Sequence, residues 1–323
     1  MKSKPEIVVI GAAIVDLPLY PVGRDVFDRA SSPVERMAMT VGGDAINEAT
    51  ILTRLGHTVR LVSAVGQDPA GSFVLEHCRK NKIDSSFLAV SGTLTTSINV
   101  PLISPDGERS VITNRSGSLW QLCLDDLDLS CLEEGSVLSF ASIFNNPRLD
   151  QPAMLEIFRR AKERGMTICA DMVSPRFAEK VDDIRQALAY VDYFFPNYDE
   201  ACELTGLTEL DEIADSFLAC GVKNVIIKIG RRGAYVKNAQ ECFIVPIYPK
   251  ANCVDTTGAG DNFASGFITA LLEGRSLRQC AEFANVTASI AIEAVGATTA
   301  LQSRAQADER YEKYRNFYLG EAQ

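Results

Sequence analysis

Apolar residues follow two different spacings along the chain. Short continuous apolar runs predict strands at Glu6–Gly11, Val59–Val65, Val137–Ala141, Thr167–Ala170, Tyr193–Phe195 and Val225–Ile229. Between several of these runs, apolar positions recur every three or four residues and predict helices, for example over Gly43–Leu55 and Ala70–Asn81. Strands that alternate with helices are typical of right-handed βαβ units. The pattern therefore predicts an α/β fold with a mostly parallel central sheet covered on both faces.

Two segments do not fit this alternation. Thr95–Ile103 and Arg109–Thr113 are extended runs close together in sequence, and they predict a β-hairpin. We expect this hairpin to join the irregular stretch near residues 12–40 in a small sheet that projects from the main one. The chain, residues 1–323, is then one domain with a lid formed by about 12–40 and 94–116, and a cleft separates the lid from the main sheet.

Composition and charge exclude several classes of protein. The 323 residues carry a net charge of −10, which disfavours a nucleic-acid partner or an anionic membrane surface. No apolar run approaches the roughly 18 residues of a membrane span, so a cytoplasmic protein with no membrane partner is expected. The nine cysteines form no Cys-x-x-Cys pair and there are only two histidines, so the cysteines are expected to be buried, reduced thiols.

The segment most informative about chemistry is Asp-Thr-Thr-Gly-Ala-Gly-Asp at residues 255–261. It leads into an apolar, helix-forming run, so the amides of Gly258, Ala259 and Gly260 can converge on an anion at the positive end of a helix. Asp261 then lies beside that anion site, where it can accept the proton of an attacking hydroxyl. The alternative is an ordinary helix start after a glycine turn. No P-loop of the form Gly-x-x-x-x-Gly-Lys-Ser/Thr is present.

This heptad resembles the C-terminal signature of the ribokinase-like (PfkB-type) carbohydrate kinases. Residues 42–49, Gly-Gly-Asp-Ala-Ile-Asn-Glu-Ala, resemble the first signature of the same family. The resemblance spans most of the chain. It implies a ribokinase-like three-layer α/β/α domain with a small β-sheet lid, and it places the sugar substrate at Asp16, Gly42, Gly43 and Asn47. Taken alone, Asp16 would be a solvated turn residue and Asn47 an incidental polar residue.

The resemblance also assigns residues to ATP and Mg²⁺. Asn197 and Glu200 match an Asn-x-x-Glu motif that positions Mg²⁺, here through water; a helix capping box is the alternative for the same pair. The predicted contacts to ATP come from Lys228, Gly230, Gly233, Thr256 and Asn285. The alternatives are a cation at the end of a strand for Lys228 and a plain surface residue for Asn285.

Two further features bear on ions and on the substrate. Asp255 and Thr257 fall where relatives bind an activating monovalent cation, so K⁺ is a candidate cofactor beside ATP and Mg²⁺. Relatives that act on keto-deoxy sugar acids often carry Asp-x-Asn-x-Arg after a central strand. Residues 171–176 read Asp-Met-Val-Ser-Pro-Arg instead, which weakens the case for an acidic substrate, although Arg115 or Arg109 in the lid could still meet an anion.

The expected function is therefore ATP-dependent phosphorylation of a hydroxyl of a small sugar of the ribose or fructose type. Asp261 is the expected base, and the amides of Gly258–Gly260 hold the transferred phosphate. A nucleoside kinase of the same fold and a non-catalytic sugar-binding regulator are the alternatives. A dinucleotide-dependent dehydrogenase is disfavoured because no Gly-x-Gly-x-x-Gly follows the first strand. A homodimer formed through the lid is also expected.

Overall fold

The computed structural model describes residues 6–106 and 108–320. Its first strand, β1 (Ile7–Ile10), is completely buried and contributes alternate residues to two separate apolar clusters. Ile7 and Val9 belong to one cluster, and Val8 and Ile10 belong to the other. Because successive side chains of a strand point to opposite faces, a continuous apolar run marks a strand that is covered on both sides.

In the described part of the chain the larger sheet has nine strands, in the order β15-β14-β13-β12-β11-β10-β1-β6-β7. The strands from β7 to β13 are parallel, whereas β14 and β15 are antiparallel additions at one edge. The predicted mostly parallel sheet is confirmed, although β7, β14 and β15 were not predicted. Besides β1 the bounds are β6 (Val59–Gly66), β7 (Asp84–Ser91), β10 (Val137–Ile143), β11 (Thr167–Met172), β12 (Tyr193–Phe194), β13 (Asn224–Lys228), β14 (Ala234–Asn238) and β15 (Cys242–Val245).

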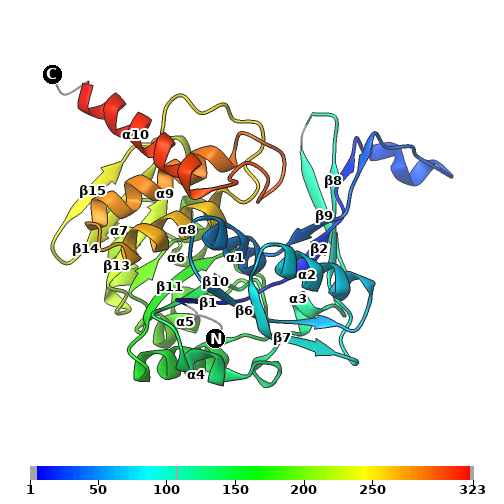
Figure 1. Cartoon of the computed structure of the whole chain (residues 1–323), viewed down its shortest axis with the longest axis horizontal. Coiled ribbons are helices and arrows are strands. Elements are labelled where there is room, and N and C mark those ends of the chain that lie inside the picture. Colours follow the sequence, from blue (N-terminus) through cyan, green and yellow to red (C-terminus); the bar gives the residue numbers. More distant parts are fainter. Residues whose placement is uncertain (1–5, 107, 321–323) are drawn as a thin grey trace.

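Helices cover both faces of this sheet and give the expected three layers (Figure 1). One apolar cluster joins the sheet to α1 (Asp44–Arg54), α2 (Pro69–Lys80), α8 (Ala259–Leu272), α9 (Leu277–Ala291) and α10 (Arg304–Gly320). The other cluster joins it to α4 (Gln151–Glu163), α5 (Val181–Leu188), α6 (Tyr198–Thr205) and α7 (Leu210–Ala219). Among the described helices none is both long and apolar enough to cross a membrane.

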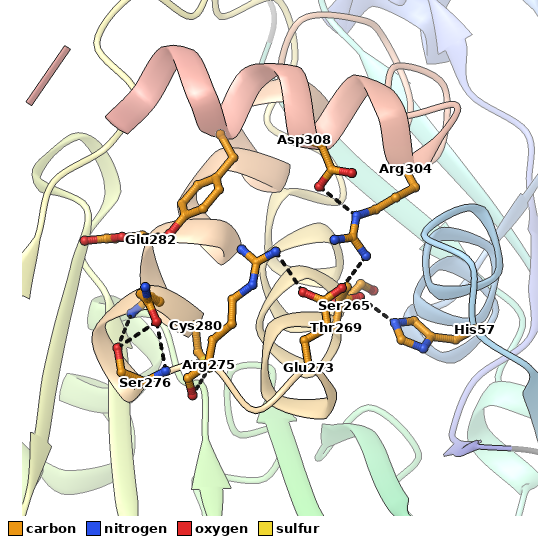
Figure 2. Close-up of polar contacts among 12 residues, drawn as sticks. His57, Ser265, Thr269, Glu273, Arg275, Ser276, Cys280, Glu282, Arg304 and Asp308 are labelled. Carbon is orange, nitrogen blue, oxygen red and sulfur yellow. Dashed lines mark hydrogen bonds and ion pairs between the residues drawn. The ribbon is translucent and has the colours of Figure 1, made fainter. Parts of the chain in front are cut away.

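Polar contacts hold α8 in place at the end of the helix distant from Gly258 (Figure 2). The Thr269 hydroxyl lies 3.2 Å from Nε2 of His57, which follows α1. Glu273, next to the last turn, forms an ion pair with Arg304 of α10, and the Arg304 Nε donates to Asp308 at 2.7 Å. These contacts join the C-terminal part of α8 to α10 and to the residues that follow α1.

A second, smaller sheet projects from the helical body (Figure 1). Its β8 lies beside β2 and β3, both parallel to it, and β9 pairs antiparallel with β8. The expected union of the hairpin with the stretch near residues 12–40 is therefore confirmed. The strands of this sheet are β2 (Ile14–Asp16), β3 (Leu19–Tyr20), β4 (Arg36–Met37), β5 (Thr40–Gly42), β8 (Ile98–Ile103) and β9 (Arg109–Thr113). Short helical segments elsewhere in the described chain are η1 (Arg24–Asp28), α3 (Ser118–Gln121), η2 (Leu124–Asp126), η3 (Leu129–Glu133) and η4 (Gly230–Arg232).

Candidate active site

The start of α8 presents free backbone amides. Gly258 precedes the helix with φ +74°, and a Cβ there would lie 2.4 Å from the Cβ of Ala297, so only glycine fits. The N–H of Ala259 donates to the Thr256 carbonyl at 3.2 Å. The N–H groups of Gly260 and Asp261 donate to no group in the described part of the chain. Two amides at the positive end of a 14-residue helix are therefore available to an anion.

Asp261 lies in the first turn of α8 and is held from the other predicted motif. The Asn47 Nδ2 donates to the Asp261 Oδ2 at 2.8 Å, so the side-chain amide of Asn47 orients the carboxyl group. Burial raises the pKa of Asp261 well above its usual value, and the negative charge of Asp44 raises it further. A carboxyl group with a raised pKa is a stronger base once it is ionised, which suits proton abstraction from a hydroxyl.

The glycine pair shapes the wall opposite α8. A Cβ on Gly42 would lie 2.2 Å from the Asp16 Oδ2, so glycine at this position makes room for the Asp16 carboxyl group. Gly43 has φ +95°, and a Cβ there would lie 2.5 Å from the Ala12 carbonyl oxygen. Burial raises the pKa of Asp16 to about 6, and Asp44 contributes to the shift. Asp16 is therefore largely ionised at neutral pH.

A cavity of about 460 Å³ connects these residues. It is lined by residues of the small sheet, the start of α1 and the start of α8. Two buried amide oxygens in its wall, Asn47 Oδ1 and Asn99 Oδ1, have no hydrogen-bond partner among the described residues. Of the predicted site the cavity brings together Asp16, Gly43, Asn47, Thr257, Gly258, Gly260 and Asp261. Its other polar lining residues, Asp44, Asn99, Thr113, Asn145 and Arg176, were not assigned to the site from the sequence.

Three of these added residues form a hydrogen-bonded chain along the cavity. The Arg176 Nη2 donates to the Asn145 Oδ1 at 2.8 Å, and the Asn145 Nδ2 donates to the Asp44 Oδ2 at 2.7 Å. The Arg176 guanidinium also lies 4.7 Å from the ring centre of Trp120, just beyond the hairpin. Asp44 could have been found because it follows the glycine pair directly. Asn145 lies in an irregular segment after β10, where no sequence signal marked it.

A buried ion pair lies on the other side of the α8 start. The Lys228 Nζ is 2.5 Å from the Asp171 Oδ2, and it would be 3.2 Å from a Cβ on Gly260. The predicted capping box of Asn197 and Glu200 is present, with both backbone-to-side-chain distances at 2.9 Å. Burial raises the pKa of Glu200 to about 7, against the opposing effect of the Lys228 charge.

The sequence of the chain matches the model of a known protein family. The model of the pfkB family carbohydrate kinases matches residues 4–304. The chain belongs to that family. It is 28% identical over 313 residues to the aminoimidazole riboside kinase of Salmonella typhimurium, with 93% of each chain covered, and 27% identical over 281 residues to the 2-dehydro-3-deoxygluconokinase of Bacillus subtilis, with 84% and 86% covered.

A solved structure shows the same fold. The Arabidopsis thaliana ribokinase complexed with ribose and ATP superposes with a TM-score of 0.82 at 23% identity, over 96% of this chain and 99% of that one. The ribokinase-like fold predicted from the sequence is therefore confirmed, and the chain is a carbohydrate kinase of the pfkB family.

The other residues that were predicted to contact ATP have distinct surroundings in this pfkB family kinase. Gly230 is exposed and has open space where a Cβ would stand. Gly233 has φ +97°, and a Cβ there would lie 1.9 Å from the Val245 oxygen, so packing already explains this glycine. Asn285 is buried and donates to the Val245 oxygen at 3.0 Å, which joins α9 to the end of β15. Thr256 is exposed. The contacts of these residues with ATP stay predictions.

The two predicted ion sites also stay predictions. The Asp255 carboxylate accepts hydrogen bonds from Thr257 N at 3.0 Å, Thr257 Oγ1 at 2.8 Å and Gly296 N at 2.9 Å, so a monovalent cation would share this group with three donors. No group of three or more His, Cys, Asp or Glu side chains in the described residues could hold a metal directly. The residues present fit Mg²⁺ bound largely through water, because burial raises the pKa of the Glu200 carboxyl group and a nearby cation would favour its ionised form.

Proposed function

We propose that this pfkB family kinase transfers the γ-phosphate of ATP to a hydroxyl group of a small sugar, with Asp261 as the general base. One observation carries the proposal. The Asp261 carboxyl group opens on the cavity, is oriented by Asn47, and lies in the same helix turn as the free amides of Gly260 and Asp261. A base and an anion site thus share one wall of a cavity that can hold a sugar.

The proposed reaction follows from that geometry. The sugar hydroxyl gives its proton to the Asp261 carboxylate while its oxygen attacks the γ-phosphorus. The bond from the phosphorus to the bridging oxygen breaks, and the electron pair leaves with ADP. The amides of Gly260 and Asp261 stabilise negative charge on the transferred group, aided by the helix dipole. Mg²⁺, held near Glu200 and Asn197 through water, would supply further positive charge to the phosphates.

Acceptor atoms dominate the proposed sugar site. Within the described ranges no donor reaches the side-chain oxygens of Asn47 and Asn99, and the Asp16 carboxylate lines the same cavity. A ligand with several hydroxyl groups satisfies these acceptors, which supports a sugar of the ribose or fructose type. A sugar acid is the second candidate, because Arg176 lines the cavity in spite of its displaced position in the sequence. A nucleoside is the third candidate, and the assay of substrates tests it beside the sugars.

The small sheet is proposed to act as a lid and as a dimer interface. Its side chains include exposed apolar residues, among them Met37 at 60% and Ile112 at 54% exposure. Covering them with the small sheet of a second copy would remove apolar surface from water. Sedimentation at micromolar concentration is expected to show a dimer that Ile112→Glu dissociates; a wild-type monomer would contradict this part of the proposal.

The function is tested by ADP release in a coupled assay with Mg-ATP. The panel contains pentoses, ketohexoses, sugar acids and nucleosides, and it is run with the wild type and with Asp261→Asn. We expect turnover on one class, lowered ~10²-fold or more in the variant, which is the scale of a positioned base. Asp150→Asn is the control, because Asp150 caps α4 away from the cavity and should keep full turnover. Equal turnover in Asp261→Asn and the wild type would contradict the assignment.

A further inference from the structure

Lys228 and Asp171 form an ion pair at the edge of the sheet where the parallel strands end. Lys228 is the last residue of β13, and Asp171 lies next to the end of β11, with β12 between the two strands. The side chains are only 16% and 6% exposed, and Nζ and Oδ2 are 2.5 Å apart. Taking two charges out of water is costly, so a buried pair by itself is poor evidence of a stabilising role.

The pair is placed against the proposed anion site. A Cβ on Gly260 would lie 3.2 Å from the Lys228 Nζ and 3.7 Å from the Asp171 Oδ2. The absence of a side chain at Gly260 therefore lets the ammonium group approach the first turn of α8. The free amides of Gly260 and Asp261 lie in that same turn. A phosphate bound to these amides would be within reach of a cation at the Lys228 position.

The surroundings of Lys228 are strongly acidic. Burial alone would lower the pKa of Lys228, but the carboxylates of Asp171, Glu200 and Asp261 outweigh this effect and raise it. The positive charge of Lys228 in turn lowers the pKa values of Asp171, Glu200 and Asp261, which burial raises. Lys228 therefore stays charged. Its charge offsets the negative carboxylates at the place where the phosphates of ATP would add further negative charge.

We propose that Asp171 is a positioning residue, which holds the Lys228 ammonium group beside Gly260 so that it contacts the transferred phosphate. This inference rests on the proposed function. Lysine is a compact charge on a flexible stem, so its position must be set by a partner. Asp171 supplies that partner from a rigid central strand, whose Met172 N–H also donates to the Asp171 Oδ1 at 2.8 Å. A displacement of about 1 Å in a catalytic group can cost as much as ~10²-fold in rate.

The test is a double-mutant cycle on turnover per folded site. The variants are Asp171→Asn, Lys228→Met and the double variant, assayed with Mg-ATP and the sugar on which the wild type acts. We expect Asp171→Asn to lower kcat about tenfold and to leave the KM of the sugar within about twofold, because Lys228 acts on the phosphate rather than on the sugar. In the Lys228→Met background, Asp171→Asn should lower kcat no further.

A structural control exists in the same sheet. Asp192, directly before β12, pairs with Lys162 and Lys223 at a distance from the cavity, and its side chain is 10% exposed. Asp192→Asn should lower the melting temperature without changing kcat per folded site. Unchanged kcat in Asp171→Asn, or an equal tenfold loss in both backgrounds, would overturn the role of Asp171. If the wild type itself transfers no phosphate to any sugar, the proposed function fails, and this inference fails with it.

Discussion

Alanine in place of glycine at two positions near the start of α8 should have opposite effects on stability. Gly258 has φ +74°, and a Cβ there would lie 2.4 and 2.5 Å from the Cβ and Cα of Ala297. The left-handed conformation costs a non-glycine residue about 1–2 kcal/mol, and overpacking costs about 1–3 kcal/mol. Gly260 is helical, and a Cβ there would lie 3.2 Å from the Lys228 Nζ and 3.7 Å from the Asp171 Oδ2, so its one tight contact is with the end of a lysine side chain. Alanine should there gain about 0.5 kcal/mol of helix propensity.

These free energies translate into measurable melting temperatures. The entropy of unfolding, about 2.1 cal/mol/K per residue, amounts to roughly 0.7 kcal/mol/K for 323 residues. One kcal/mol then shifts the melting temperature by about 1.5 °C. Gly258→Ala should therefore melt about 3–7 °C below the wild type, and Gly260→Ala should melt within about 1 °C of it.

Activity should separate from stability in Gly260→Ala. The new methyl group would lie 3.2 Å from the Lys228 ammonium group, in the same helix turn as the free amides of Gly260 and Asp261, so it would crowd a phosphate bound there. We expect kcat/KM for ATP to fall about 10- to 100-fold although the protein is as stable as the wild type. The measurements are thermal melts followed by circular dichroism and a coupled ADP-release assay. Equal destabilisation of the two variants, or full activity in Gly260→Ala, would refute this account of the anion site.

Two further predictions concern pH. Burial raises the pKa of Asp16 to about 6, so the Asp16 carboxylate becomes protonated as the pH falls below that value. Sugar affinity, measured by calorimetry, should therefore weaken about tenfold from pH 7 to pH 5. The variant Asp16→Asn should not show this pH dependence. Burial lowers the pKa of His77 to about 4, so between that value and about 6.5 the unfolded chain binds more protons than the folded chain. The free energy of unfolding should therefore fall as the pH is lowered from 7 to 5. Urea unfolding should show a smaller fall in His77→Gln than in the wild type. A flat calorimetric profile for the wild type, or an unchanged acid sensitivity in His77→Gln, would contradict the respective assignment.

The sequence predicted those parts of the site that depend on local backbone geometry. Gly258 and Gly43 are required by positive φ values, and such positions leave a readable signature of glycine in front of a helix. Asp261 and Asn47 come from two motifs, and their hydrogen bond at 2.8 Å confirms that the motifs meet.

The missed residues depend on contacts between distant segments. Asp171 meets Lys228 across β12, 57 residues further along the chain, and Asn145 joins Asp44 to Arg176 from an irregular segment. No spacing of residues in the sequence predicts such contacts, because they depend on the order of the strands in the sheet. The strands β14 and β15 were missed for a related reason: they are antiparallel edge strands, outside the rhythm of the parallel units.

The central claim is that Asp261 activates a sugar hydroxyl for attack on the γ-phosphate of ATP. The most direct measurement follows ³²P from γ-labelled ATP, with the wild type and Asp261→Asn, after both proteins are shown to bind ATP equally by calorimetry. The account predicts that label appears in a sugar phosphate with the wild type, and ~10²-fold more slowly with the variant. Label that appears only in inorganic phosphate, or equally fast transfer by the variant, would contradict it.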